Sequence, residues 1–96
     1  MIVEWTKRAR RERRDAFRYL FIEAGSLQAA MRIDAEFDTR LGLLAQYPDA
    51  GRQGRVPGTR ELVIADTPYL VAYRVRGDRV LVLRLFHHAQ RWPKRL

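Results

Sequence analysis

The sequence contains no cysteine and no long apolar run. Without cysteine the chain forms neither disulfides nor thiolate metal sites, and nothing in its composition requires an oxidising compartment. Its apolar runs are only a few residues long, far below the roughly 20 residues of a membrane-spanning helix, and no signal-peptide pattern opens the chain. These absences predict a cytoplasmic protein. A length of 96 residues predicts a single domain over residues 1–96 with one hydrophobic core.

Lysine is also nearly absent, although the chain is strongly basic. Lys7 and Lys94 are the only lysines, so 17 of the 19 basic residues are arginine, and the formal net charge is +8. A charge excess of this size predicts an acidic partner such as nucleic acid, a membrane surface or an acidic protein. Arginine suits such partners because its guanidinium group matches the geometry of phosphate and carboxylate, although high-GC codon usage alone would also enrich arginine.

The first half of the sequence has the pattern of a short strand followed by two helices. Residues 1–5 are rich in β-branched and aromatic side chains, and Thr6 can cap a helix that Gly25 ends. Ser26 can cap a second helix that ends near Tyr47. Apolar residues recur every three or four positions, which predicts a helical hairpin with one buried seam. The seam residues are Ala9, Ala16, Phe17, Leu20, Phe21, Ala24, Ala30, Ile33, Phe37, Leu41 and Leu44.

The second half has the pattern of a long loop followed by three strands. Glycine and proline recur through residues 47–58, which predicts a connecting loop that exposes Arg52 and Arg55. Strands with short turns between them are expected at residues 61–65, 69–75 and 80–86. The expected fold is therefore α+β with the order βααβββ, in which a helical hairpin packs on an antiparallel sheet.

The last two expected strands form a hairpin around Gly77 and Asp78. The expected cross-strand pairs are Arg76 with Arg79, Arg74 with Leu81, Ala72 with Leu83, and Leu70 with Leu85. Both faces of this hairpin are then largely apolar, with Arg84 and Phe86 on the face opposite Leu70. Because two helices cover only one face, the other is expected to be an exposed apolar patch that binds a protein partner.

Basic residues gather at the start of the first expected helix. They are Lys7, Arg8, Arg10, Arg11, Arg13 and Arg14. Positive charge there opposes the helix dipole, which favours acidic residues in the first turn by roughly 0.3 to 1 kcal/mol each. Helical projection places Arg13 within the apolar seam and most of the others opposite it. The cluster is interpreted either as a solvated face or as a contact for an anionic partner.

His87 and His88 are candidates for acid–base chemistry. Adjacent residues of a strand point to opposite faces, so the two rings cannot chelate one ion if the strand runs through both. With no cysteine and scattered acidic residues, neither a metal site nor a cofactor is expected. A histidine near neutral pH could move protons in ribonuclease chemistry, with arginines stabilising a pentavalent phosphate. The alternative is a packed or exposed residue at the end of the strand.

The C-terminal end mixes basic and aromatic residues. They are His87, His88, Arg91, Trp92, Lys94 and Arg95, joined by Arg52, Arg55 and Arg60 from earlier in the chain. Aromatic rings beside phosphate-binding arginines suit single-stranded nucleic acid. Trp92 followed by Pro93 is equally consistent with a plug that packs the C-terminus onto the sheet.

Residues 57–93 resemble the C-terminal half of the RelE/ParE toxin family, especially its ParE-like and plasmid-stabilisation branch. The shared features are the Gly-x-Arg-Glu pattern that ends at Glu61, a Tyr-rich strand, a hairpin, and a terminal His followed by Arg and an aromatic residue. Trp5, Ala9 and Tyr19, together with the helix ending at Tyr47, extend the resemblance over nearly the whole chain. The resemblance implies the βααβββ fold and a cognate acidic antitoxin that wraps the toxin.

The resemblance implies one of two activities. ParE-like members inhibit DNA gyrase without known nuclease chemistry, and other members are ribosome-dependent endonucleases that cut mRNA. For a gyrase-binding toxin, the candidate target-binding residues are Arg52, Arg55, Arg60, Arg91 and Trp92. For a ribonuclease, the candidate catalytic residues are His87, His88, Arg60, Arg74 and Arg91. A third interpretation is a nucleic-acid-binding module without toxicity.

Two departures from the ribonuclease pattern favour the gyrase-binding interpretation. The position that opens the penultimate strand, where ribonuclease members have an arginine, is Leu70. The position after the last strand, where an arginine is common, is Gln90, although Arg91 is adjacent. Loss of a guanidinium group that stabilises a transition-state phosphate costs several kcal/mol of barrier. An efficient nuclease is therefore disfavoured.

Overall fold

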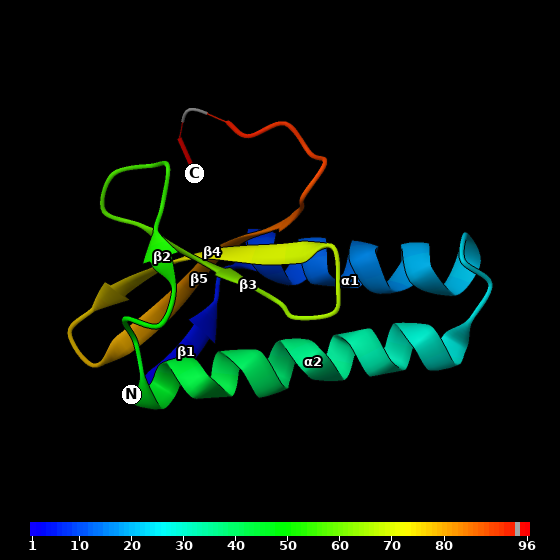
Figure 1. Ribbon diagram of the computed structural model, residues 1–96, viewed down its shortest axis with the longest axis horizontal. Helices are drawn as coiled ribbons and strands as arrows, with labels where there is room; N and C mark the ends of the chain where they lie inside the picture. Colours follow the sequence, from blue (N-terminus) through cyan, green and yellow to red (C-terminus); the bar gives the residue numbers. More distant parts are fainter. Residues whose placement is uncertain (94) are drawn as a thin grey trace.

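The computed structural model describes residues 1–93 and 95–96, and it has two helices packed on a five-stranded sheet (Figure 1). The elements are β1 (Ile2–Trp5), α1 (Lys7–Ile22), α2 (Leu27–Gln46), β2 (Arg52–Gln53), β3 (Arg60–Val63), β4 (Tyr69–Arg76) and β5 (Arg79–His87). The predicted α+β class is confirmed. The predicted order is also found, with one addition: the expected loop at residues 47–58 contains the two-residue strand β2. Within the described residues, neither helix is long and apolar enough to cross a membrane.

The strands lie in the order β1-β5-β4-β3-β2. The β4–β5 hairpin forms the middle of the sheet, and the pairs from β5 through β2 are antiparallel, as expected. β1 runs parallel to β5 and pairs only with its first half, from Arg79 to Val82. Because the chain leaves β1 at Thr6 to begin α1, the second half of the β5 edge has α1 beside it in place of a strand.

The predicted helix caps are confirmed. The Thr6 hydroxyl accepts a hydrogen bond from the Ala9 amide at 3.1 Å, and the Ser26 hydroxyl accepts one from the Ala29 amide at 3.1 Å. Each cap satisfies an amide group that has no partner within its own helix. Between the helices, Gly25 has a φ of 67°, a left-handed conformation in which a side chain would be strained.

The main hydrophobic core lies between the helical hairpin and one face of the sheet. The seam residues Phe37, Leu41 and Leu44 of α2 are buried against Tyr73 of β4 and Val82 of β5. Burial of apolar side chains is the main favourable contribution to folding, roughly 25 cal/mol for each Å² removed from water. Burial of these seam residues therefore determines which face of the sheet the helices cover.

The register expected for the β4–β5 hairpin is wrong beyond its first half. Arg76 pairs with Arg79 and Arg74 with Leu81 as predicted, but Ala72 faces Arg84 and Leu70 faces Phe86. The shift occurs because Leu83 is an extra residue in β5, a β-bulge that has no partner on β4. Alternation of apolar residues cannot reveal such a bulge when both faces are apolar.

The bulge changes which side chains face the helices. Leu85 turns into the main core, where its exposed fraction is 3%, while Arg84 and Phe86 turn to the opposite face. There Phe86 packs with Leu70 and Ala72 in a second, smaller core. The sheet is therefore apolar on both faces, as predicted, but beyond the bulge the residues of β5 lie on the opposite face from the one expected.

The prediction of an exposed apolar patch on the second face of the sheet is wrong. Leu70, Ala72 and Phe86 are buried because the C-terminal segment folds back over them, and the Trp92 ring lies 4.3 Å from the Phe86 ring between centroids. In Figure 1 this segment lies on the opposite side of the sheet from α2. The alternative prediction, that Trp92 packs the C-terminus onto the sheet, is confirmed.

Arg13, which falls within the apolar seam, joins the two helices. Its guanidinium group donates to Asp34 at 2.7 Å and to Asp38 at 2.9 Å, and it lies over the rings of Trp5 and Phe37 at 5.0 and 5.5 Å. Burial by itself lowers the pKa of Arg13, but the hydrogen bonds and charges of the two aspartates raise it above its ordinary value. Arg13 is therefore permanently charged and internally paired.

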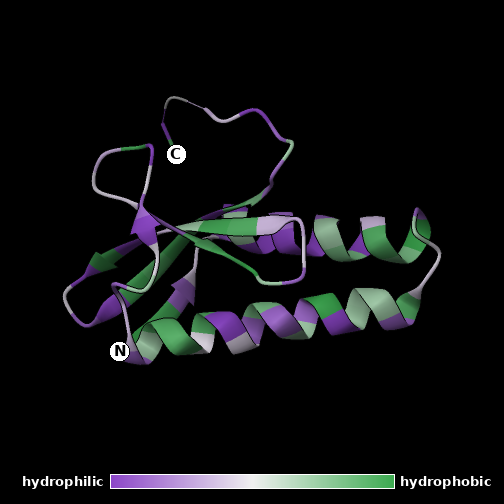
Figure 2. Cartoon of the chain, in the orientation of Figure 1, coloured by the Kyte–Doolittle hydropathy of each residue, from purple (hydrophilic) through white to green (hydrophobic). Residues whose placement is uncertain are grey.

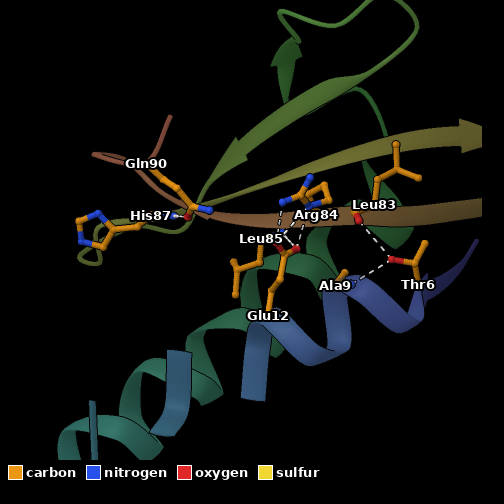
Figure 3. Close-up of polar contacts among 8 residues, drawn as sticks. All are labelled: Thr6, Ala9, Glu12, Leu83, Arg84, Leu85, His87 and Gln90. Atoms are coloured by element: carbon orange, nitrogen blue, oxygen red, sulfur yellow. Dashed lines mark hydrogen bonds and ion pairs between the residues drawn. The ribbon is translucent and has the colours of Figure 1, made fainter. Parts of the chain in front are cut away.

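A second buried ion pair joins α1 to β5 (Figure 3). Arg84 donates to Glu12 through Nε and Nη2, the latter at 2.8 Å, and the Glu12 carboxylate also accepts from the Leu85 amide at 3.0 Å. At the start of α1, the hydroxyl of the cap residue Thr6 donates to the Leu83 carbonyl at 3.1 Å. Glu12 of α1 and the cap residue Thr6 therefore satisfy backbone groups of β5 near the bulge, on the edge that β1 does not cover.

We predict that Glu12→Ala lowers the free energy of unfolding by about 3 kcal/mol, because it leaves the Arg84 charge and the Leu85 amide buried without a partner. Urea denaturation followed by circular dichroism measures the change. Glu36→Ala is the control, since Glu36 forms only a partly exposed pair with Arg40 on α2, for which about 0.5 kcal/mol or less is expected. Equal losses in the two variants would contradict the role given to Glu12.

Candidate functional site

A groove of about 770 Å³ runs along α1 on the helical side of the molecule. Its apolar lining comes from Trp5, Phe17, Phe21 and Ile22, and its polar lining is mostly arginine. The lining arginines are Arg10, Arg13, Arg14 and Arg18. Apart from Arg13, these arginines have no acidic partner among residues 1–93 and 95–96. The groove therefore combines an apolar floor with unneutralised positive charge.

The groove continues toward the tip of the helical hairpin, the end farthest from the sheet. Hydrophobic residues are prominent at this tip in Figure 2. Phe21 is 47% exposed, and Ile22, Leu27 and Met31 are also exposed. Phe21 and Ala24 were expected in the buried seam, and this part of the prediction is wrong, because the sheet does not extend far enough to cover them. A large apolar patch left open on a small protein is typical of a binding surface.

The loop between α2 and β3 presents two arginines on the other side of the sheet. Arg52 donates to Glu61 Oε1 through Nε at 3.3 Å and through Nη2 at 3.0 Å. Arg55 donates its backbone amide to Glu61 Oε2 at 2.8 Å, and its Nε lies 3.4 Å from the same oxygen. Both arginine side chains remain more than half exposed, while the Glu61 side chain is almost fully buried.

These arginines meet the C-terminal segment. The Arg55 guanidinium carbon lies 4.0 Å from the centroid of the Trp92 ring, a cation–π geometry. Arg52 and Arg55 also line a cleft of about 190 Å³ together with Thr67 and His88. Three of the five predicted target-binding residues, Arg52, Arg55 and Trp92, are therefore gathered on one surface.

The other two predicted target-binding residues lie apart from that group. Arg60 donates to the Gly51 carbonyl at 2.8 Å and approaches Asp49 at 3.6 Å, so it holds the loop from within. Arg91 is exposed next to Trp92 in the C-terminal segment. Lys94, part of the basic and aromatic end of the sequence, lies outside the described residues.

The predicted catalytic residues line different clefts. Arg60 and Arg74 line one cleft of about 330 Å³, and His88 lines the cleft with Arg52 and Arg55. His87 lines a third cleft of about 280 Å³, beside Glu12 and Gln90. No described cleft brings a histidine together with Arg60 or Arg74.

The two histidine rings would point to opposite faces only if the strand ran through both residues, and this condition is not met, because β5 ends at His87. The rings stack with centroids 4.7 Å apart. His87 Nδ1 accepts a hydrogen bond from the Ala89 amide at 3.1 Å. Figure 3 shows His87 beside Gln90, whose side chain accepts from the His87 amide. Among the described residues, no three potential ligands are grouped to hold a metal.

The residue that organises the exposed arginines, Glu61, was not recognised as a candidate. The sequence contains one sign of its role: Glu61 is an acidic residue close in sequence to Arg52, Arg55 and Arg60. Burial by itself raises the pKa of its carboxyl group, but the hydrogen bonds from the Arg55 amide and the Arg52 side chain, with both positive charges, hold the pKa below its ordinary value.

Comparisons with known proteins agree with this fold. Residues 3–92 match the sequence model of a protein family, which is described as "ParE toxin of type II toxin-antitoxin system, parDE". A Sinorhizobium fredii protein named "Putative toxin Y4kP" is 43% identical over 92 residues, which cover 96% of this chain and 93% of that protein. A solved structure described as the chromosomal ParDE TA system from P. aeruginosa has a TM-score of 0.83 at 25% identity, over 91% of this chain and 95% of that chain.

The family match and the 43% identical relative both extend over nearly the whole sequence, and the solved structure has the same arrangement of helices and sheet. The resemblance noted in the sequence is therefore confirmed. This chain belongs to the ParE toxin family of type II toxin-antitoxin systems.

Proposed function

We propose that this toxin inhibits growth by binding a replication target such as DNA gyrase, and that a cognate acidic antitoxin neutralises it. The proposed target-binding surface consists of Arg52, Arg55, Arg91 and Trp92, with Arg60 holding the loop behind it. Exposed guanidinium groups beside an aromatic ring suit the anionic and apolar features of a macromolecular partner. The proposed target is cytoplasmic, so the proposal places the toxin in the cytoplasm.

The separation of the candidate catalytic residues is the observation that supports binding over cleavage. A nuclease needs its proton-transferring group and its phosphate-stabilising groups around one phosphate. Here Arg60 and Arg74 line one cleft while His87 and His88 line two others. A binding surface has no such requirement, since separate charged and aromatic contacts can each add affinity.

The alternative proposal is a ribosome-dependent mRNA endonuclease. It is favoured by one specific arrangement, the cleft in which His88 lies with Arg52 and Arg55. In this function His88 would act as the acid or base, and the two arginines would bind the scissile phosphate.

The groove along α1 is proposed as the antitoxin-binding site. Its apolar floor and its unpaired arginines, Arg10, Arg14 and Arg18, fit an amphipathic helix that carries acidic residues on its flanks. Acidic residues of this helix would relieve the mutual repulsion of the arginines, so charge and apolar burial both favour the same partner. A short acidic protein encoded next to this gene is the expected antitoxin.

We predict that the purified toxin slows supercoiling of relaxed plasmid by gyrase and leaves translated mRNA intact. Arg55→Gln/Arg91→Gln should raise the inhibitory concentration about 10- to 100-fold, because hydrogen bonds to charged groups contribute roughly 1.5 to 3 kcal/mol. Arg32→Gln, an exposed position on α2, is the matched control and should inhibit like the wild type. Unimpaired supercoiling together with mRNA cuts that disappear in His88→Gln would favour the endonuclease.

We predict that Phe21→Glu prevents rescue by the adjacent acidic protein but leaves toxicity intact. The substitution puts a negative charge into the apolar floor where an acidic helix would lie, so binding should weaken about 100-fold or more. Leu43→Glu makes the same change at an exposed position near the other end of α2. Co-expression with growth measurement tests both variants, and rescue of Phe21→Glu as complete as that of Leu43→Glu would refute the proposed groove.

A further inference from the structure

Glu61 lies at the centre of the contacts that hold the exposed arginines. It faces Arg52 on β2 and Ala72 on β4 in the sheet register, and Ala72 in turn faces Arg84 on β5. Residues that face one another across strands share a side of the sheet, so Glu61 lies on the side that the C-terminal segment covers. Among these four facing residues, Glu61 carries the only acidic group.

Both oxygens of the Glu61 carboxylate are used. Oε1 accepts from the Arg52 side chain, and Oε2 accepts from the Arg55 amide while pairing with the Arg55 guanidinium group. A guanidinium group has five N–H donors in a fixed plane, and the contact with Glu61 uses the Nε side of Arg52. The remaining donors of Arg52 are therefore held in one orientation and still face outward.

The loop has little freedom to present these arginines in another way. The Gly54 amide donates to the Thr59 carbonyl at 2.8 Å, and a Cβ atom on Gly54 would collide with the Thr59 side chain. The Gly51 amide donates to the Tyr73 hydroxyl at 2.9 Å, and a Cβ there would lie 2.7 Å from the same ring. Backbone contacts fix both ends of the loop, and Glu61 fixes the two side chains between them.

We propose that Glu61 is the positioning residue of the target-binding surface: its buried carboxylate orients Arg52 and Arg55 and, through Arg55, holds Trp92 on the sheet. The inference rests on the proposed function, in which Arg52, Arg55 and Trp92 contact the target. Glu61 itself is almost fully buried, so it acts through the arginines and does not touch a partner.

Two features separate this role from simple charge neutralisation. The side chains of Arg52 and Arg55 are half exposed. Water could therefore solvate their charges even if no buried carboxylate were present. Burying a carboxylate is costly unless it is fully hydrogen-bonded, and its four contacts all lead to these two residues. The arrangement therefore favours one geometry of the arginines, beyond balancing their charge.

We predict that the stabilising effect of Glu61 is lost in acid. Because the folded-state pKa of Glu61 lies below its ordinary value, its contribution is fully present above the unfolded pKa of about 4.3 and disappears as the pH falls through the folded pKa. The difference in melting temperature between wild type and Glu61→Gln should therefore shrink below about pH 4. A difference that stays constant from pH 7 to pH 3 would contradict this ionised, hydrogen-bonded carboxylate.

The positioning role is tested by acrylamide quenching of Trp92 fluorescence in a Trp5→Phe background, which leaves one tryptophan. Glu61→Gln should raise the quenching constant about twofold, because a neutral amide holds Arg55 less firmly and Arg55 covers the Trp92 ring. Glu36→Gln, the same chemical change on α2, should leave it unchanged. In an Arg55→Gln background, Glu61→Gln should add no further quenching, since it acts through Arg55.

Gyrase inhibition by the same variants provides the functional readout. Glu61→Gln should weaken inhibition about tenfold, with circular dichroism like that of the wild type. Quenching and inhibition equal to those of Glu36→Gln, or a quenching effect that adds to that of Arg55→Gln, would overturn the inference. If Glu61→Gln does not fold, Arg55→Gln alone must raise Trp92 quenching, and an unchanged value would also overturn it. Absence of gyrase inhibition by the wild type would refute the proposed function separately, because the quenching result does not depend on gyrase.

Discussion

The contact between the first turns of α1 and the second half of β5 is the constraint on which the rest of the structure depends. The Thr6 hydroxyl bonds the Leu83 carbonyl, and Glu12 bonds both the Leu85 amide and the buried Arg84. These contacts take the place of strand partners at the one part of β5 that β1 does not reach. They stabilise the bulge at Leu83, and the bulge determines which side chains of β5 face the helices and which face the C-terminal segment.

Two groups of arginines have different roles. Arg13 and Arg84 are paired internally with Asp34 and Glu12, and they join α1 to α2 and to β5. Arginines of the other group, in the α1 groove and at the loop before β3, are exposed. The internal pairs carry little net charge, whereas Arg10, Arg14 and Arg18 of the groove are exposed and have no acidic partner among the described residues. A positive surface of this kind attracts acidic partners and speeds their association.

The two proposed binding surfaces lie on opposite sides of the sheet. The groove and the hairpin tip are built from the helices, whereas Arg52, Arg55 and Trp92 lie beside the C-terminal segment. In the proposed function, an antitoxin helix in the groove leaves the arginine surface uncovered unless another part of the antitoxin reaches around the sheet. Neutralisation would then require an antitoxin that contacts both sides, as expected of a chain that wraps the toxin.

Local sequence determined the helix caps at Thr6 and Ser26, the apolar seam, the hairpin turn at Gly77 and the basic character, because each depends on residues close together in the chain. Only the tertiary structure decided the bulge at Leu83, since both faces of the hairpin are apolar and alternation cannot choose between registers. It also decided that Trp92 covers the second face and that Glu61 gathers Arg52 and Arg55. These features depend on contacts between residues far apart in sequence, which a pattern of neighbours does not contain.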